Sequence, residues 1–295
     1  NTNGGVLKAT STANDAVVID AQGKKSKFVN ETTSTKAIDT QGKWKIYSAS
    51  PEQNTFGKNR KNLNSETDAQ WTSDSTKFAA NGSDKNKFIF QATPVITLYT
   101  DDYLKTYGDE VSPDTLNNLL KGKEAFFTGL DGKSHNVNEY SSAFKEKGYT
   151  EYISGATVTS DGSTATATRT GGKYEATDKS GADHKNAVYD LTVNLNNAKA
   201  LNGYAIDTEN GKLEIKKRTA SITGTGTQTY GDTDGTIKNW TDTQTNIADG
   251  STVSYTTSIK SDSDYTKNKG SRNTADYGTY NDSVSFNDLK ITDAK

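Results

Sequence analysis

The sequence of 295 residues contains no cysteine and no methionine, and it has only 3 prolines. Without cysteine the chain can have no disulfide bond, no thiolate zinc site and no cysteine nucleophile. Secreted eukaryotic modules of this size usually carry disulfides. A disulfide-free chain rich in threonine and asparagine is more typical of an extracellular bacterial protein.

The sequence also has no strong excess of positive or negative charge and no long apolar run. The 35 basic and 37 acidic side chains leave a net charge of -2, and no run of like charges predicts nucleic acid or an anionic membrane as a partner. No apolar run approaches the roughly 18 residues of a transmembrane helix. Because the sequence begins with NTNGG, without methionine or a signal peptide, we expect a fragment or a processed product.

The aromatic content indicates a folded protein. Hydrophobic residues make up only 31% of the chain, but it has 15 Tyr, 9 Phe and 3 Trp. Disordered segments are poor in aromatics. We therefore expect a hydrophilic β-rich fold with thin cores.

Alternating apolar and polar residues, the period of a half-buried strand, dominate the sequence. AVYDLTVNL at 187–195 is the clearest case. Further strands are predicted in KLEIKK (212–217), KFIFQATPVITLYT (87–100, divided at Pro94), STVSYTTSI (251–259) and DSVSFNDLKI (282–291).

One segment has the period of a helix. Ser112 is a candidate N-cap, Pro113 suits the first helical position, and leucines follow at 116, 119 and 120. This pattern predicts a short helix over about 113–121. Asn202-Gly203 and Asn210-Gly211 predict tight turns.

The tetrapeptide Thr-Tyr-Gly-Asp occurs at 106–109 and again at 229–232. Each copy follows a predicted strand, and each is followed much later by a strand with Leu-x-Ile. The repeat therefore predicts two tandem modules, at 95–218 and 219–295. Residues 1–94 have very short apolar clusters about every 8–10 residues, which suit either the rungs of a β-solenoid or an ordinary β-sandwich.

Several of these motifs occur together in one known family. Residues 28–57 contain Phe-Val-Asn, GKWKIYS, a proline and Thr-Phe-Gly. They resemble the segment that closes the β-helical stalk of filamentous-haemagglutinin-like exoproteins of two-partner secretion systems. AQWTSD (69–74) resembles that family's Ala-x-Trp, and NKFIF (86–90) resembles its Arg-Tyr-x-Phe motif. The join LEIKKRTASITG to TYGD at 213–232 resembles the boundary between two of its YDG/MBG-type repeat modules. Lys43, Lys45 and the enlarged first module depart from the pattern.

The resemblance covers most of residues 25–295, and with the periodicity it implies an all-β fold. We expect the end of a right-handed β-solenoid, followed by two tandem modules that are Ig-like or β-grasp-like, with one short helix in the first. The expected parts are terminal solenoid rungs or a cap at 1–50, a connecting β segment at 51–94, and the modules at 95–218 and 219–295.

The resemblance also implies an extracellular, non-enzymatic adhesin fragment of the bacterial cell surface. It would attach to a glycan or protein ligand of host cells or matrix, or support aggregation and biofilm formation. The full-length protein would use an outer-membrane transporter barrel as a partner, and the fragment is expected to be monomeric without a cofactor. A structural spacer without a ligand is the alternative, and a carbohydrate-active enzyme is a remote one.

The repeated tetrapeptide is interpreted as a turn. Gly108 and Gly231 would take positive φ, Asp109 and Asp232 would bond N–H groups of the turn, and Tyr107 and Tyr230 would contribute rings to the core. We therefore expect no catalytic residues here. His135 and His184 lie in polar segments and are interpreted as solvated loop residues.

Other candidate sites are weaker. Asp232 and Asp234 begin an Asp-x-Asp-Gly stretch that could bind calcium but lacks the glutamate of an EF-hand loop. Tyr149, Tyr152 and Trp240 could contact a ligand, or could supply core mass. Sequons for glycosylation occur at four positions: Asn30, Asn81, Asn239 and Asn281.

Overall fold

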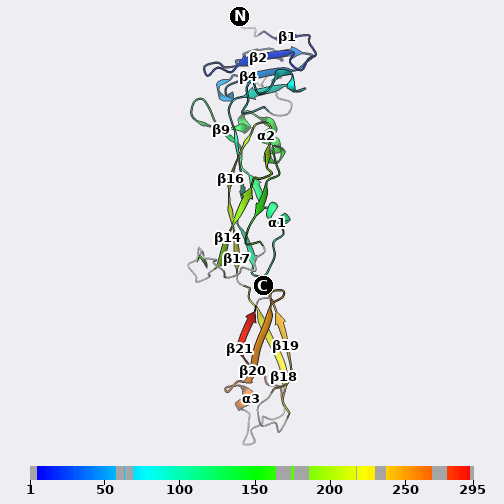
Figure 1. Cartoon of the computed structure of the whole chain (residues 1–295), viewed down its shortest axis with the longest axis vertical. Helices are drawn as coiled ribbons and strands as arrows, with labels where there is room; N and C mark the ends of the chain where they lie inside the picture. The colour runs from blue at the N-terminus through cyan, green and yellow to red at the C-terminus, as the bar shows by residue number, and fades with distance from the viewer. Residues whose placement is uncertain are drawn as a thin grey trace. The chain divides into compact units, whose positions relative to one another are not determined.

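A computed structural model describes most of the chain (Figure 1). The described residues are 5–57, 63, 69–163, 174–175, 186–216, 218–229, 237–267 and 278–292. They form mostly β-strands, which confirms the predicted all-β class. Their α-helices are short: α1 (Pro113–Asn117), α2 (Ser142–Lys147) and α3 (Asp264–Lys267). Single 3-10 turns occur at Pro51–Gln53, Ala80–Gly82, Val137–Glu139 and Tyr149–Glu151.

The chain divides into two compact units. Unit 1 comprises residues 1–102, 112–160 and 190–212, and unit 2 comprises 103–111, 161–189 and 213–295. This division follows spatial compactness, whereas the modules at 95–218 and 219–295 follow the repeated sequence. The modules remain a prediction.

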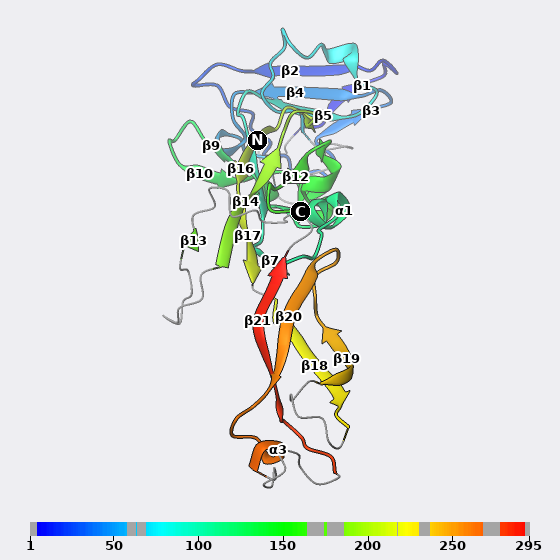
Figure 2. The same cartoon turned by 60° about the horizontal axis from the view of Figure 1, so that its bottom comes forward.

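Unit 1 begins with strands that stack in parallel. β2 (Val17–Ala21), β4 (Trp44–Ser48) and β5 (Lys87–Phe90) form one parallel sheet, and β1 (Leu7–Ala9) pairs in parallel with β3 (Ile38–Thr40). Figure 2 shows β2 and β4 side by side. β4 is the central strand of this sheet, with β2 and β5 hydrogen-bonded on its two sides.

Every residue of β4 is buried, including a lysine. Lys45 is 0% exposed, and its Nζ donates to the carbonyl oxygens of Asn14 at 2.6 Å and Lys85 at 2.8 Å. A buried ammonium needs such partners because burial removes its water. The lysine is therefore accommodated at this buried position by backbone oxygens.

The centre of unit 1 is built from aromatic rings. Trp71 is fully buried, and its ring centroid lies 5.0 Å from that of Phe90, 5.5 Å from Phe127 and 6.2 Å from Tyr204. Trp44 and Phe88 continue the same core, with centroids 5.0 Å apart. Aromatic area supplies the hydrophobic burial that the few aliphatic side chains cannot.

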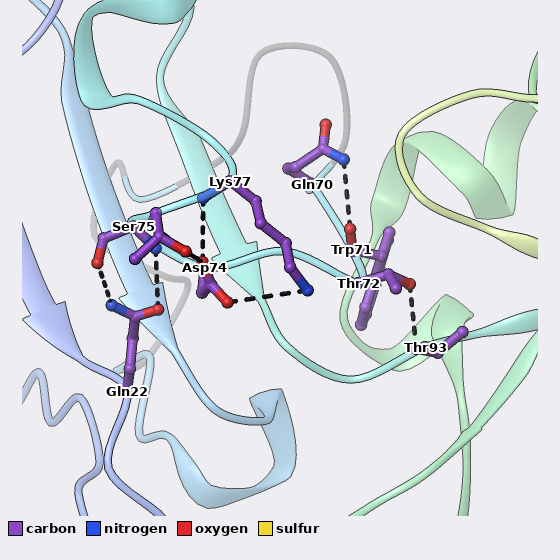
Figure 3. A network of polar contacts seen from close by, with 9 residues as sticks. Gln22, Gln70, Trp71, Thr72, Asp74, Ser75, Lys77 and Thr93 are labelled. Atoms are coloured by element: carbon purple, nitrogen blue, oxygen red, sulfur yellow. Dashed lines mark hydrogen bonds and ion pairs between the residues drawn. The ribbon is translucent and has the colours of Figure 1, made fainter.

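Polar contacts hold the segment that follows Trp71 (Figure 3). Gln22 Nε2 donates to Ser75 Oγ at 2.7 Å, and Ser75 N donates back to Gln22 Oε1 at 3.0 Å. Asp74 accepts from the backbone N–H groups of Thr76 and Lys77. Its hydrogen bond with the Thr76 hydroxyl is the main cause of a carboxyl pKa below the usual 3.8.

A mixed sheet forms the second part of unit 1. Its central strand β6 (Val95–Thr100) pairs in parallel with β16 (Ala205–Glu209) and antiparallel with β8 (Leu120–Gly122). β9 (Phe126–Thr128) pairs with β6 and with β10 (Ser134–Asn136). Ile96 and Leu98 are fully buried, so one face of the sheet lies on the core. Further antiparallel pairs in unit 1 are β11 (Ile153–Ser154) with β15 (Lys199–Ala200) and β12 (Thr157–Thr159) with β14 (Asn186–Asn194).

The described residues of unit 2 include strands of the sheet β12-β14-β17-β7, in which β13 also pairs with β14, and two hairpins. β7 (Tyr103–Thr106) pairs in parallel with β17 (Gly211–Lys216), and β13 (Tyr174–Glu175) pairs with β14. The hairpins are β18 (Ser221–Thr227) with β19 (Lys238–Thr245), and β20 (Thr252–Ile259) with β21 (Val284–Thr292), each antiparallel (Figures 1 and 2).

The structure corrects the predicted helix at about 113–121. Ser112 caps α1 as expected, since its Oγ accepts from Thr115 N at 3.1 Å. The helix ends at Asn117, however, and Leu120–Gly122 form β8. Pairing of Leu120 with Thr100 of β6 outweighs the helical spacing of three leucines. Helices α2 and α3 were not predicted.

Of the two predicted Asn-Gly turns, one is confirmed. Asn202 and Gly203 have φ of 54° and 81°, as a tight turn with two left-handed residues requires. Asn210-Gly211 is not such a turn. Asn210 alone separates β16 from β17, and Gly211 N donates to Thr100 Oγ1 at 2.8 Å.

Candidate functional site

The outer face of the β6 sheet gathers exposed side chains of several kinds. Register places Phe126 beside Val95, Lys121 beside Tyr99, and residues of β16 beside those of β6. We define the outer face by its outward residues, which alternate with the buried ones: Val95, Thr97, Tyr99, Lys121, Phe126, Thr128, Ser134, Asn136, Asp207 and Glu209.

The two ends of the outer face differ in chemistry. At one end Phe126 is 43% exposed and Val95 is 37% exposed. At the other, Lys123 Nζ lies 2.6 Å from Glu209 Oε1 and 5.6 Å from the centroid of the Tyr99 ring. The outer face therefore has an apolar aromatic end and a charged end whose groups can donate and accept hydrogen bonds.

Polar groups beside Phe126 are held in place. Asn136, opposite Phe126 in the register of β9 and β10, donates through Nδ2 to Glu124 Oε2 at 2.6 Å. Asn138 Nδ2 donates to the other oxygen of the same carboxylate at 2.9 Å. These bonds orient an amide and a carboxylate beside an exposed ring.

Phe126 was not among the predicted site residues, although the sequence contains a signal for its exposure. Phe126 and Phe127 are consecutive in EAFF, and two consecutive residues of a strand point to opposite faces. Phe127 is 2% exposed, so its neighbour must face outward. The predicted helix ended at about residue 121, and no strand was predicted for residues 124–127, so the argument was not applied there.

The predicted ligand-contact aromatics are packed against other groups. Tyr149 donates through its hydroxyl to Leu120 O at 3.0 Å, and its ring occupies the space that a side chain at Gly122 would fill. Tyr152 is 4% exposed and stacks on Phe144, with centroids 5.2 Å apart. Both rings contribute to the core of unit 1.

Trp240 packs between the two hairpins of unit 2. Its Nε1 donates to the Tyr255 hydroxyl at 3.0 Å, and its ring meets Phe286 edge to face at 5.6 Å. A Cβ at Gly224 would lie 2.2 Å from the indole. The glycine thus leaves room for the ring, which links the hairpins.

The first Tyr-Gly-Asp copy forms a turn. Asp109 N donates to Thr106 O at 3.0 Å, and Gly108 has a φ of 84°. The Asp109 carboxylate does not follow the prediction that it would bond N–H groups of the turn. It pairs with the Arg218 guanidinium, whose Nε also donates to Tyr107 O at 2.7 Å. Tyr107 is half-buried.

Several predicted sites lie outside the described residues. These are the second turn with Tyr230, Gly231 and Asp232, the calcium candidate Asp234, and His184. Within the described parts of the chain, no group of three or more His, Cys, Asp or Glu side chains could hold a metal ion.

His135 lies in β10 rather than in a solvated loop. Its ring stacks on Phe127 with centroids 5.5 Å apart, and its Nε2 lies 3.0 Å from Asp131 Oδ1. This hydrogen bond is the main cause of a lowered carboxyl pKa at Asp131. Ser134 precedes His135 in the strand and points to the opposite face. The imidazole therefore cannot take the proton of the Ser134 hydroxyl, as the base of a Ser-His catalytic pair would.

The sequons differ in accessibility. Asn30 is 6% exposed, and its Nδ2, the atom to which a glycan would be attached, donates to Phe56 O at 2.9 Å. The folded chain therefore gives no access to that atom. Asn81, Asn239 and Asn281 are exposed.

A buried lysine in unit 2 makes stability depend on pH. Lys105 is 4% exposed, and its Nζ donates to Gly162 O at 3.0 Å and Ser163 O at 3.2 Å. Burial lowers the pKa of Lys105 below its usual 10.5, while Asp109 and Glu110 act in the opposite direction. The unfolded chain thus binds this proton more tightly than the folded chain.

The stability of the protein relative to a Lys105→Met variant should therefore increase as the pH rises toward 10.5, and level off above it. Urea unfolding of both proteins, followed by circular dichroism from neutral pH upward, measures the difference. A difference that stays constant with pH, or falls, would contradict a depressed pKa at Lys105.

Comparison of the chain with protein-family models, with curated proteins and with solved structures gave no match. None of the described helices combines the length and the hydropathy needed to cross a membrane.

Proposed function

We propose that the chain is part of an extracellular bacterial adhesin and that it attaches through the outer face to a glycan of host cells or matrix. The observation that carries the proposal is the exposed ring of Phe126, held on a paired strand beside oriented polar groups. An aromatic ring can cover the apolar face of a sugar, while amides, hydroxyls and carboxylates bond its hydroxyl groups.

The arrangement of unit 1 supports attachment at a surface. The side chains of the outer face stand on β6, β8, β9, β10 and β16, whose opposite side lies on a core of fully buried residues such as Ile96 and Leu98. A rigid scaffold lowers the entropy lost when a ligand binds. The motif resemblance of residues 28–57 and 213–232 to secreted adhesins favours the cell surface as the location.

The experiment is binding of the labelled chain to an array of host and matrix glycans, with Phe126→Thr as the test variant. Threonine keeps the strand propensity but removes the ring, and affinity should fall roughly tenfold or more, as for a hot-spot aromatic. Val18→Thr is the matched control, because Val18 is 48% exposed on β2 and should leave affinity unchanged.

Three outcomes distinguish the alternatives. Glycan binding lost in Phe126→Thr supports the proposal. Binding only to host or matrix proteins would assign a protein ligand instead. If the folded chain binds neither glycans, matrix proteins nor cells, the outer face is not a recognition site.

A structural spacer is the second candidate function. The parallel stacking of β2, β4 and β5 favours it, since such stacking can be continued along a stalk without any ligand. The spacer predicts that Phe126→Thr changes neither binding nor stability.

A further inference from the structure

We infer that the parallel strand pairs β6–β16 and β7–β17 act as a shear clamp, which keeps the segment 95–216 folded when the chain is pulled along its length. The inference concerns resistance to force. It is independent of the proposed ligand and applies equally to a spacer.

The direction of the pairs is the first observation. β6 and β16 run parallel with Val95 beside Ala205 and Tyr99 beside Glu209. A pull on the chain before Val95 draws β6 toward its N-terminal end, whereas a pull after Lys216 draws the later strands toward their C-terminal ends. Parallel strands pulled in opposite directions slide against each other, so all their hydrogen bonds carry the force together.

The second pair has the same direction. In unit 2, β7 and β17 run parallel from Tyr103 beside Leu213 to Thr106 beside Lys216. Tyr107 N then donates to Lys216 O at 2.9 Å. The same pull therefore also loads this pair in shear.

Further hydrogen bonds extend the β6–β16 pair beyond the ends of its strands. In unit 1, Gly211 N donates to Thr100 Oγ1 at 2.8 Å, and Lys212 N donates to Asp102 Oδ1 at 2.8 Å. Ala205 N donates to Pro94 O at 2.8 Å at the beginning of the series. Within unit 1, hydrogen bonds thus follow one another from Pro94 to Lys212 without a long gap.

Burial protects these bonds from water. Ile96 and Leu98 of β6 are 0% exposed, as is Leu213 of β17, and Ile215 is 4% exposed. A buried hydrogen bond that is broken leaves its donor and acceptor without water as a replacement. Sliding the strands must therefore break many hydrogen bonds at once, which raises the free-energy barrier to unfolding. Forced unfolding is slow for this reason.

Single-molecule pulling between two introduced cysteines tests the inference. The chain has no cysteine of its own, so two introduced thiols are the only attachment points. Thr93→Cys with Thr219→Cys loads the pairs in shear. Thr93→Cys with Leu201→Cys pulls from the N-terminal ends of β6 and β16, which peels the bonds apart one after another.

The unfolding force should be several-fold higher in the shear geometry than in the peeling geometry. Equal forces, or a lower force in shear, would overturn the inference. Circular dichroism of both double variants confirms beforehand that each is folded, since all three substituted residues are exposed.

Thr100→Val supplies a second measurement. Valine matches the shape of threonine but removes the acceptor of Gly211 N–H, which lies at the end of β6 remote from the peeling point. The variant should lower the force in shear and leave the peeling force unchanged. An equal reduction in both geometries would mean a general loss of stability and would count against a clamp.

Discussion

Replacement of Trp71 by alanine should lower the free energy of unfolding of unit 1 by about 3–5 kcal/mol, the loss typical of a large aromatic removed from a packed core. Trp71 is fully buried and packs against Phe90, Phe127 and Tyr204. Its removal would leave a cavity bounded by three rings that cannot all move into the space.

The indole nitrogen adds little to this loss. Trp71 Nε1 is buried without a hydrogen-bond partner, so a Trp71→Phe variant removes an unsatisfied donor along with part of the ring. We expect Phe to retain much of the stability that alanine loses. Urea unfolding followed by far-UV circular dichroism measures both variants.

Trp240→Ala is the comparison for Trp71→Ala. Trp240 is only partly buried and lies in unit 2. Its replacement should lower the free energy of unfolding by less than Trp71→Ala does. The change should appear in the part of the unfolding curve that reports on unit 2. If Trp71→Ala cost no more than a surface substitution, about 0.5 kcal/mol, the aromatic core described for unit 1 would be wrong.

The second large effect is expected at Gly203. Its φ is 81°, and a Cβ there would lie 2.0 Å from the carbonyl oxygen of Trp71. Alanine at this position meets two costs: about 1–2 kcal/mol for the left-handed backbone and a further ~1–3 kcal/mol for the overpacked contact. Backbone atoms cannot move aside as the end of a flexible side chain can.

Gly132→Ala separates these two costs. Gly132 has a similar φ of 75°, but nothing lies within 4 Å of the position of its Cβ. The control variant should therefore lose only the backbone contribution, and Gly203→Ala should lose clearly more. Equal losses in the two variants, measured by urea unfolding, would show that the approach of Gly203 to Trp71 is not tight.

Much of the strand content could be predicted because alternation survives in this polar sequence. The alternation of Tyr189, Leu191 and Val193 predicted β14, and Pro94 correctly divided β5 from β6. The Asn202-Gly203 turn was also predictable, because its two left-handed residues suit Asn and Gly. These are local features that need no knowledge of partners.

Features that depend on distant partners could not be predicted. The pairing of β6 with β16 joins residues about 110 positions apart, and no local pattern specifies it. The same reason explains the shorter α1, because Leu120 joins β6. It also explains why the burial of Lys45 was not predicted, because its partners Asn14 and Lys85 lie far from it in the sequence.

For the candidate site, the sequence identified suitable residue types but not their exposure. Tyr152 was as plausible a ligand contact as any tyrosine, yet packing against Phe144 buries it. Phe126 was overlooked, and it is exposed because Phe127 takes the inward position of β9. Exposure is decided by which face of a sheet meets the core, and that depends on tertiary packing.

Adherence of beads coated with the chain to cell layers tests the proposed attachment most directly. Coating with the wild-type chain, with Phe126→Thr and with Val18→Thr at equal density compares the outer face with an exposed strand elsewhere. The proposal predicts that wild-type and Val18→Thr beads adhere alike, that Phe126→Thr beads adhere much less, and that uncoated beads do not adhere. Equal adherence of all three coated beads would contradict recognition through the outer face.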